Sequence, residues 1–152
     1  MTTMQLKKQL LEQCNLFVST RLENIQKTIN SNKKALQSET KSSAGDKHET
    51  GRAMLQLEME KAGQQFASIS EMKLTLEKIN ISKTSKNVCL GSLIKASNGN
   101  YFLATSVGKI SIENENYFAI SSHSPIGKLL FGKQQGDFII WNSTKILITE
   151  IL

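Results

Sequence analysis

The sequence holds little of what disulfide-rich, membrane-spanning or metal-dependent proteins rely on. Among 152 residues there are two cysteines, two histidines and one proline, too few for a disulfide scaffold or a Cys/His metal cluster. No apolar run approaches the ~20 residues that a membrane-spanning helix needs, and the N-terminus has no continuous apolar segment of signal-peptide type. We therefore expect a cytoplasmic protein without a membrane span, in which Cys14 and Cys89 are small core residues.

Signatures of a self-contained catalyst are missing as well. The chain has no Gly-x-Ser-x-Gly turn, no phosphate-binding glycine loop and no metal-ligand spacing, so an autonomous enzyme is not expected. What the chain does have is a formal net charge of +6 at pH 7. Such a balance favours an anionic partner, namely nucleic acid, an acidic protein face or an anionic membrane surface, although it also serves solubility alone.

Two runs of apolar residues at helical spacing fill the N-terminal half. The first is Leu11, Cys14, Val18, Leu22, Ile25, Ile29 and Leu36, and the second is Leu55, Met59, Ala62, Phe66, Ile69, Met72, Leu76 and Ile79. Intervals of mainly three and four residues place each run on one helix face, and the polar stretch 39–46 between them is typical of a turn. We predict an antiparallel coiled-coil hairpin over residues 1–80, about 50 Å long at 1.5 Å per residue, rather than one long helix in a parallel dimer.

The turn of this hairpin, near residues 45–49, carries two carboxylates three positions apart, Asp46 and Glu49. On the first turn of a helix both lie on one side, where their oxygens suit a hard cation such as Mg²⁺ but are too few for a full cage. The pair therefore predicts half of a metal site, which a substrate or a second protein completes. The same Asp-x-x-Glu spacing is also a capping box that stabilises the helix start, and the two interpretations are compatible.

After residue 80 the apolar pattern takes the period of strands. We expect strands at 87–95, 101–105, 109–112, 117–120, 137–141 and 145–151, with turns at Asn98-Gly99 and Asn142-Ser143. A short helix follows Ser124 as its cap, with Pro125 near its first position. Residues 81–152 are thus predicted to form a small antiparallel β-sheet domain with one short helix, which makes the chain α+β. Six aromatic residues are interpreted as the core: Tyr101, Phe102, Tyr117, Phe118, Phe138 and Trp141.

Three segments together resemble the bacterial transcript cleavage factors of the Gre type, which act on stalled RNA polymerase. Gly45-Asp46-Lys47-His48-Glu49 resembles the family's Gly-Asp-x-x-Glu tip, and residues 88–92 are similar to the first strand of its C-terminal domain. The most specific match runs from Ser124 to Asp137 and is similar to the family's Ser-Pro-(Ile/Leu/Met)-…-Leu-x-Gly-Lys-x-x-Gly-Asp segment. The order and spacing of the three segments cover nearly the whole chain.

This resemblance implies a coiled-coil hairpin joined to an FKBP-like domain, and a monomeric accessory factor rather than an enzyme. The C-terminal domain would dock at the polymerase secondary channel, with His123, Ser124, Pro125 and Ile126 in the docking segment. The hairpin would enter the channel, where Asp46 and Glu49 help to hold a Mg²⁺ shared with the polymerase. The isolated protein would bind no cofactor. The polymerase would then hydrolyse its backtracked RNA by two-metal chemistry.

The sequence also departs from the family pattern. The family's tip usually continues Ser-Glu-Asn-Ala-Glu-Tyr, whereas this chain has Thr50-Gly51-Arg52 after Glu49, and His123 stands where the family typically has Asn or Asp. These changes motivate an alternative, a binding-only relative that enters the channel and inhibits transcription without supporting cleavage. A prolyl isomerase or chaperone is suggested only by analogy with the FKBP-like fold.

Four basic residues of the hairpin are candidates for contact with the extruded RNA. Lys33, Lys34, Lys41 and Arg52 could bind its phosphates. A solvated helix face explains the same residues equally well, so both interpretations stay open.

Overall fold

The computed structural model describes the backbone of residues 1–41 and 45–152, and the side chains of residues 1–39 and 49–152. The chain divides into two compact units. One is Val18–Lys73, and the other combines Met1–Phe17 with Leu74–Leu152. Helices α1 (Thr3–Lys41) and α2 (Gly45–Glu77) each contribute residues to both units. The expected boundary between residues 80 and 81 stays a prediction.

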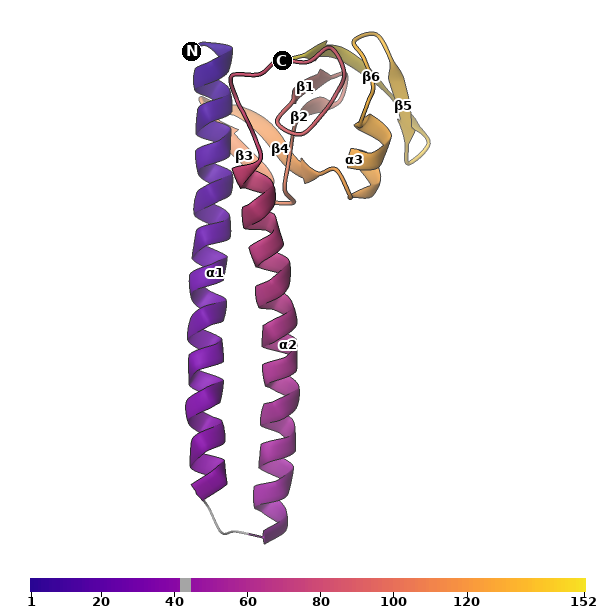
Figure 1. Cartoon of the computed structure of the whole chain (residues 1–152). Helices are drawn as coiled ribbons and strands as arrows, with labels where there is room; N and C mark the ends of the chain where they lie inside the picture. Colours follow the sequence, from indigo (N-terminus) through magenta and orange to yellow (C-terminus); the bar gives the residue numbers. More distant parts are fainter. Residues whose placement is uncertain (42–44) are drawn as a thin grey trace. The chain divides into compact units, whose positions relative to one another are not determined.

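The unit Val18–Lys73 is a hairpin of two antiparallel helices (Figure 1), as predicted. Helix α1 ends at Lys41 and α2 begins at Gly45, so the alternative of a single long helix is wrong. Every apolar residue of the two predicted stripes that falls in this unit is buried or half-buried, whereas Met54 and Leu57, off the stripes, are exposed. The 3.6-residue period therefore identified the faces that each helix buries.

Gly63 allows a test of how much stability a glycine costs inside α2. It lies inside α2, and a Cβ added there meets no atom within 4 Å. Because glycine is costly inside a helix, we expect Gly63→Ala to raise the free energy of unfolding by about 0.5–1 kcal/mol, measured by urea denaturation followed by circular dichroism.

Gly132→Ala is the matched control for this variant. Gly132 has equally open surroundings, but its φ of +81° disfavours any residue with a Cβ. Gly132→Ala should therefore lower the urea concentration at the midpoint of unfolding, and Gly63→Ala should raise it. Destabilisation by both variants would contradict this account.

The other unit contains a six-stranded sheet in the order β3-β4-β2-β1-β6-β5. Its strands are β1 (Leu93–Ala96), β2 (Gly99–Ala104), β3 (Gly108–Ile112), β4 (Glu115–Ser121), β5 (Phe138–Trp141) and β6 (Thr144–Ile151), and helix α3 (Pro125–Leu130) follows β4. The α+β class and the short helix are confirmed. One detail differs from the prediction, because β2 pairs with β4 in parallel while the other neighbouring pairs are antiparallel.

The second predicted hairpin turn lies where the sequence placed it, whereas the first is Ser97-Asn98 and so one residue earlier than predicted. Ala96 pairs with Gly99 across the first, and Asn142 and Ser143 have φ of 50° and 64° in the second, the left-handed conformation that tight two-residue turns use.

The start of the first predicted strand is wrong, because β1 begins only at Leu93. Upstream of it the backbone N–H of Cys89 donates to Ser92 Oγ at 2.9 Å, and Gly91 has a φ of 89°. Together these form a turn. Asn87 makes only an isolated bridge to Gln134.

One face of the sheet carries the main cluster of buried side chains, which α3 helps to cover through Leu130. Its members are Val88, Ile94, Tyr101, Leu103, Leu130, Ile139, Ile146 and Ile148, with Trp141 packed against it. Two of the predicted core aromatics are wrong, since Phe118 is 39% and Phe138 49% exposed. Alternate residues of a strand point to opposite faces, and their neighbours occupy the buried positions.

No helix in the described part of the chain combines the length and the apolar character that crossing a membrane requires.

Candidate functional site

The acidic pair of the sequence falls at the closed end of the helical hairpin. Because α2 begins at Gly45, the backbone of Asp46 and that of Glu49 both belong to its first turn. The Glu49 side chain is exposed. The Asp46 side chain lies outside the described residues, and so does the capping contact that the sequence suggested for it. A helix N-terminus favours negative charge at both positions.

A third carboxylate, which sequence spacing did not indicate, lies against this first stretch of α2. The carboxylate atoms of Glu39, near the end of α1, are 3.1–3.2 Å from the point where a Cβ on Gly51 would sit. The glycine at this position therefore lets the two helices approach each other closely around the Glu39 side chain. Gly51, which looked like a mere departure from the family pattern, has a packing role here.

The donor set at the hairpin end suits a hard cation, but only in part. Carboxylate oxygens are the ligands that Mg²⁺ prefers, usually one or two of them together with water and phosphate oxygens. Among the described residues, no group of three or more His, Cys, Asp or Glu side chains could hold a metal ion. Two carboxylates alone do not complete the coordination of Mg²⁺, so an ion held by Asp46 and Glu49 would need further ligands from water, phosphate or a partner.

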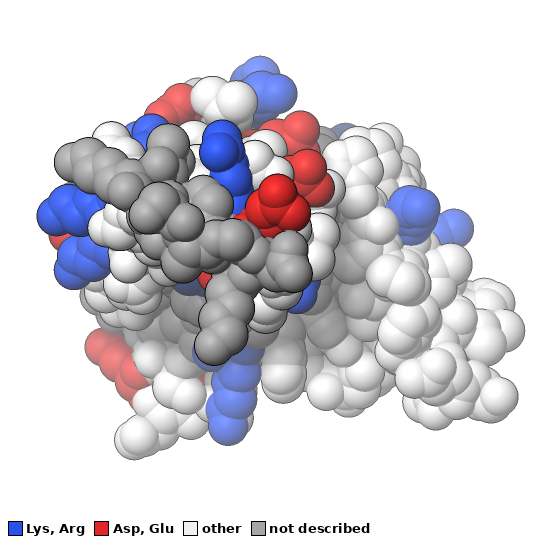
Figure 2. Space-filling model, turned by 90° about the horizontal axis from the view of Figure 1, so that it is seen from below, with Lys and Arg blue, Asp and Glu red and all other residues white. Residues whose placement is uncertain are grey.

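The structure describes the side chains of three of the four candidate RNA-contacting residues. Lys33 and Lys34 are exposed on α1, and Arg52 is exposed on α2. Lys41 is the last residue of α1, and its side chain lies outside the described residues. Figure 2 shows Lys and Arg on several sides of the described hairpin end, with Asp and Glu among them. This mixed surface favours neither RNA contact nor simple solvation over the other.

The predicted docking segment is built around the start of α3. Ser124 is the N-cap, and its Oγ accepts from the Gly127 backbone N–H at 3.1 Å and donates to the Ser121 carbonyl at 2.6 Å. Pro125 occupies the first turn, where its missing N–H costs nothing. Ser124 is thus committed to holding the helix start, and the Ser-Pro part of the motif has a structural explanation.

The remaining docking candidates differ in how exposed their side chains are. His123 and Pro125 are exposed, whereas Ile126 is half-buried and packs against the main core cluster. A partner that docks on this segment would meet the imidazole and the pyrrolidine ring first. Ile126 would support the segment from beneath.

The two cysteines occupy different surroundings, and Cys89 has an unexpected neighbour. Cys14 is fully buried, and this burial raises the pKa of its thiol to about 12. Cys89 is half-buried, and Lys7 of α1 is close enough to interact with it electrostatically. Lys7 is only 1% exposed. Burial lowers its pKa, and the electrostatic interaction with Cys89 partly opposes that shift.

Comparison with solved structures gives a match of low similarity. No protein-family model matches this sequence, and no curated protein matches it. The solved structure of the transcription factor Gfh1 aligns with 88% of this chain and 90% of its own, at 18% identity and a TM-score of 0.35. The two chains superpose only loosely as wholes, and the functional assignment depends on this chain's own residues.

Proposed function

We propose that this protein is an accessory transcription factor that binds RNA polymerase and stimulates the polymerase's own Mg²⁺-dependent cleavage of backtracked RNA. The observation that carries the proposal is the position of the acidic pair. The backbone of Asp46 and Glu49 lies in the first turn of α2 at the closed end of a two-helix hairpin, and Glu49 is exposed. A slender hairpin is suited to bringing its end into a narrow channel rather than to enclosing a substrate.

In this proposal the chain supplies only metal ligands and phosphate contacts, and residues of these types are present. Asp46 and Glu49 would contribute oxygen ligands to a Mg²⁺ whose other ligands come from the polymerase and the RNA. When bound, that ion supplies positive charge that activates water and stabilises the developing phosphate charge. The exposed Lys33, Lys34 and Arg52 would contact RNA phosphates in the same region.

The experiment that tests the proposal uses backtracked elongation complexes with 5′-labelled RNA, Mg²⁺ and the purified full chain. Shortening of the labelled RNA that depends on added protein supports stimulation of cleavage. Absence of shortening at protein concentrations that saturate the polymerase contradicts it.

Docking through the α3 segment gives a separate prediction. Because His123 and Pro125 are exposed and Pro125 has no backbone N–H that its replacement would unpair, we expect His123→Ala/Pro125→Ala to weaken binding to the polymerase at least tenfold. The midpoint of thermal unfolding should change by only a few degrees. Fluorescence anisotropy with labelled protein measures the affinity, and Lys109→Ala, at an exposed position in β3, is the control. Equal affinities for the double variant and wild type would place the docking surface elsewhere.

The alternative is a binding-only factor that occupies the polymerase without supporting cleavage. The observation that favours it lies near the tip, where the Glu39 carboxylate packs against Gly51, two residues after Glu49. The negative charge of Glu39 could change how Asp46 and Glu49 hold a Mg²⁺ shared with the polymerase. Slower RNA elongation without any RNA shortening would identify this alternative.

A further inference from the structure

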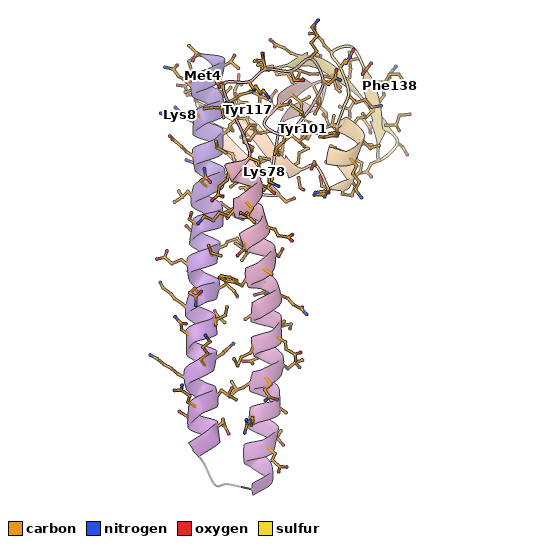
Figure 3. All side chains as sticks on the ribbon, in the orientation of Figure 1. Met4, Lys8, Lys78, Tyr101, Tyr117 and Phe138 are labelled. Atoms are coloured by element: carbon orange, nitrogen blue, oxygen red, sulfur yellow. The ribbon has the colours of Figure 1, made fainter. Side chains whose placement is uncertain are left out.

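A cleft of about 580 Å³ lies within the unit that contains the sheet, far along the chain from the acidic pair. It is lined by the segment that follows α2, by the turn before β1 and by Phe131. Two of its residues are lysines, Lys78 and Lys83, and none of the ten lining residues is acidic. Lys78 directly follows the end of α2 (Figure 3). The cleft is therefore a positively charged hollow.

Some hydrogen-bonding groups of this cleft are uncommitted, whereas the side chains of Asn80, Ser85 and Ser92 already make hydrogen bonds within the chain. Within the described part of the chain, the ammonium groups of Lys78 and Lys83 have no ion-pair partner, and the Thr84 hydroxyl makes no hydrogen bond. A second hollow shares Thr84 and Ser85 with the first, adds Lys86, and again has no acidic lining residue. The run from Lys78 to Lys86 thus presents three lysines and several hydroxyls without a balancing carboxylate.

Lys7, a buried lysine, lies near one lining residue of the same cleft but does not itself line it. Cys89 lines the cleft, and Lys7 interacts electrostatically with Cys89. Among the described residues no carboxylate forms an ion pair with Lys7, although it is 1% exposed. A buried ammonium without a counter-charge is costly, typically several kcal/mol. An anion seated in the cleft would supply the missing negative charge.

We propose that this cleft binds a small phosphate-bearing ligand. Lysine ammonium groups and hydroxyls are common phosphate partners, and the volume lies in the range of small-molecule sites. Phe131 lines the same cleft and is 54% exposed, with its ring not used in the core. An aromatic ring beside a phosphate site can stack on a base. A nucleotide therefore fits the lining better than free phosphate or pyrophosphate.

The test is calorimetric titration of the purified full chain, without polymerase, with pyrophosphate and with ATP at about 0.1 M salt. We expect saturable binding of both probes, with ATP the tighter. Lys78→Gln/Lys83→Gln should weaken both at least tenfold, while Phe131→Ala should weaken ATP only. Lys109→Gln/Lys145→Gln removes the same charge outside the cleft and should leave both affinities within about twofold of wild type.

Three results would overturn the proposal. The first is that the wild-type protein binds neither pyrophosphate nor ATP saturably. The second is that the two lysine double variants weaken binding equally. The third is that the protein binds short single-stranded RNA but neither pyrophosphate nor ATP. The site is independent of the proposed action on polymerase, so its failure would leave that proposal untouched.

Lys7→Met tests the buried charge separately. Removing an unpaired buried ammonium should leave the unliganded protein at least as stable as wild type. The same change should weaken pyrophosphate binding several-fold. Unchanged pyrophosphate affinity in a folded Lys7→Met protein would overturn the role given to Lys7.

Discussion

Replacing Asp46 by Asn and Glu49 by Gln together is expected to remove stimulation of RNA cleavage while leaving polymerase affinity within about twofold. The two amides keep the shape of the side chains but lose the negative charge that would help to hold Mg²⁺. Loss of metal-based stabilisation amounts to several kcal/mol, and each 1.36 kcal/mol is about tenfold in rate. The cleavage rate should therefore fall on the order of 100-fold or more, measured as shortening of 5′-labelled RNA in backtracked complexes.

The design of this variant separates ligation from helix capping. Asn is about as good an N-cap as Asp, so a structural contribution of Asp46 survives the change. Glu58→Gln/Glu60→Gln is the matched control, because it removes the same charge from exposed positions of the same helix. If the control and the tip variant lost cleavage equally, or if the tip variant lost polymerase binding as well, the metal-ligand role would be wrong.

Gly127→Ala is expected to destabilise the sheet-containing unit by about 2–3 kcal/mol. Gly127 is buried in α3, and a Cβ at this position would overlap the Ser121 carbonyl oxygen and crowd the Ser124 hydroxyl. Those two groups form the hydrogen bonds that start the helix. Adding a methyl group to such a site forces backbone shifts that typically cost 1–3 kcal/mol. Urea denaturation followed by tryptophan fluorescence measures the effect, since Trp141 packs against the same core.

Lys128→Ala supplies the comparison for Gly127→Ala. It introduces a methyl-sized side chain into the same short helix at an exposed position, where surface substitutions usually stay within about 0.5 kcal/mol. A Gly127→Ala protein as stable as Lys128→Ala would show that the start of α3 has room to adjust, and the structural reading of this glycine would be wrong.

The helical hairpin could be predicted from the sequence because its signal is local. Apolar spacing of three and four residues repeats over many turns, and each stripe residue in the hairpin unit is buried or half-buried. The hairpin turns of the sheet were equally local, since residues such as Asn142 and Ser143 adopt left-handed backbone at low cost. Predictions of this kind depend on neighbours in the chain and need no knowledge of what packs where.

The wrong predictions concern residues whose burial or conformation apolar patterning does not settle. Phe118 and Phe138 have the chemistry of core residues but are 39% and 49% exposed. Phe118 pairs with Tyr101 of the main cluster, with 6.1 Å between the ring centroids, yet stays partly uncovered. Phe138 alternates with the buried Ile139 and faces away from the cluster, where Lys145 Nζ lies 4.2 Å from its ring centroid. The segment 87–92 has strand composition, yet the Ser92 hydroxyl captures the Cys89 N–H and forms a turn. Competition by a side chain for a backbone donor cannot be read from apolar patterning.

The residues of the candidate sites also divide into those predicted from local patterns and those that only the structure brings together. Asp46 and Glu49 were predicted from spacing alone, and their role stays a prediction. The cap at Ser124, also a local motif, is confirmed. The position of the Glu39 carboxylate against Gly51 and the burial of Lys7 beside Cys89 join residues far apart in sequence. The acid-free run from Lys78 to Lys86 was visible in the sequence. Only the structure gathers its lysines around a cleft.

The most direct test of the central claim is the Mg²⁺ dependence of RNA cleavage in backtracked complexes, measured with polymerase alone, with wild-type protein and with Glu49→Gln protein. If the hairpin carboxylates help to hold the ion, wild-type protein will lower the Mg²⁺ concentration for half-maximal rate several-fold, and Glu49→Gln will not. The same half-maximal Mg²⁺ concentration in all three reactions would contradict the claim that this chain supplies metal ligands to the polymerase.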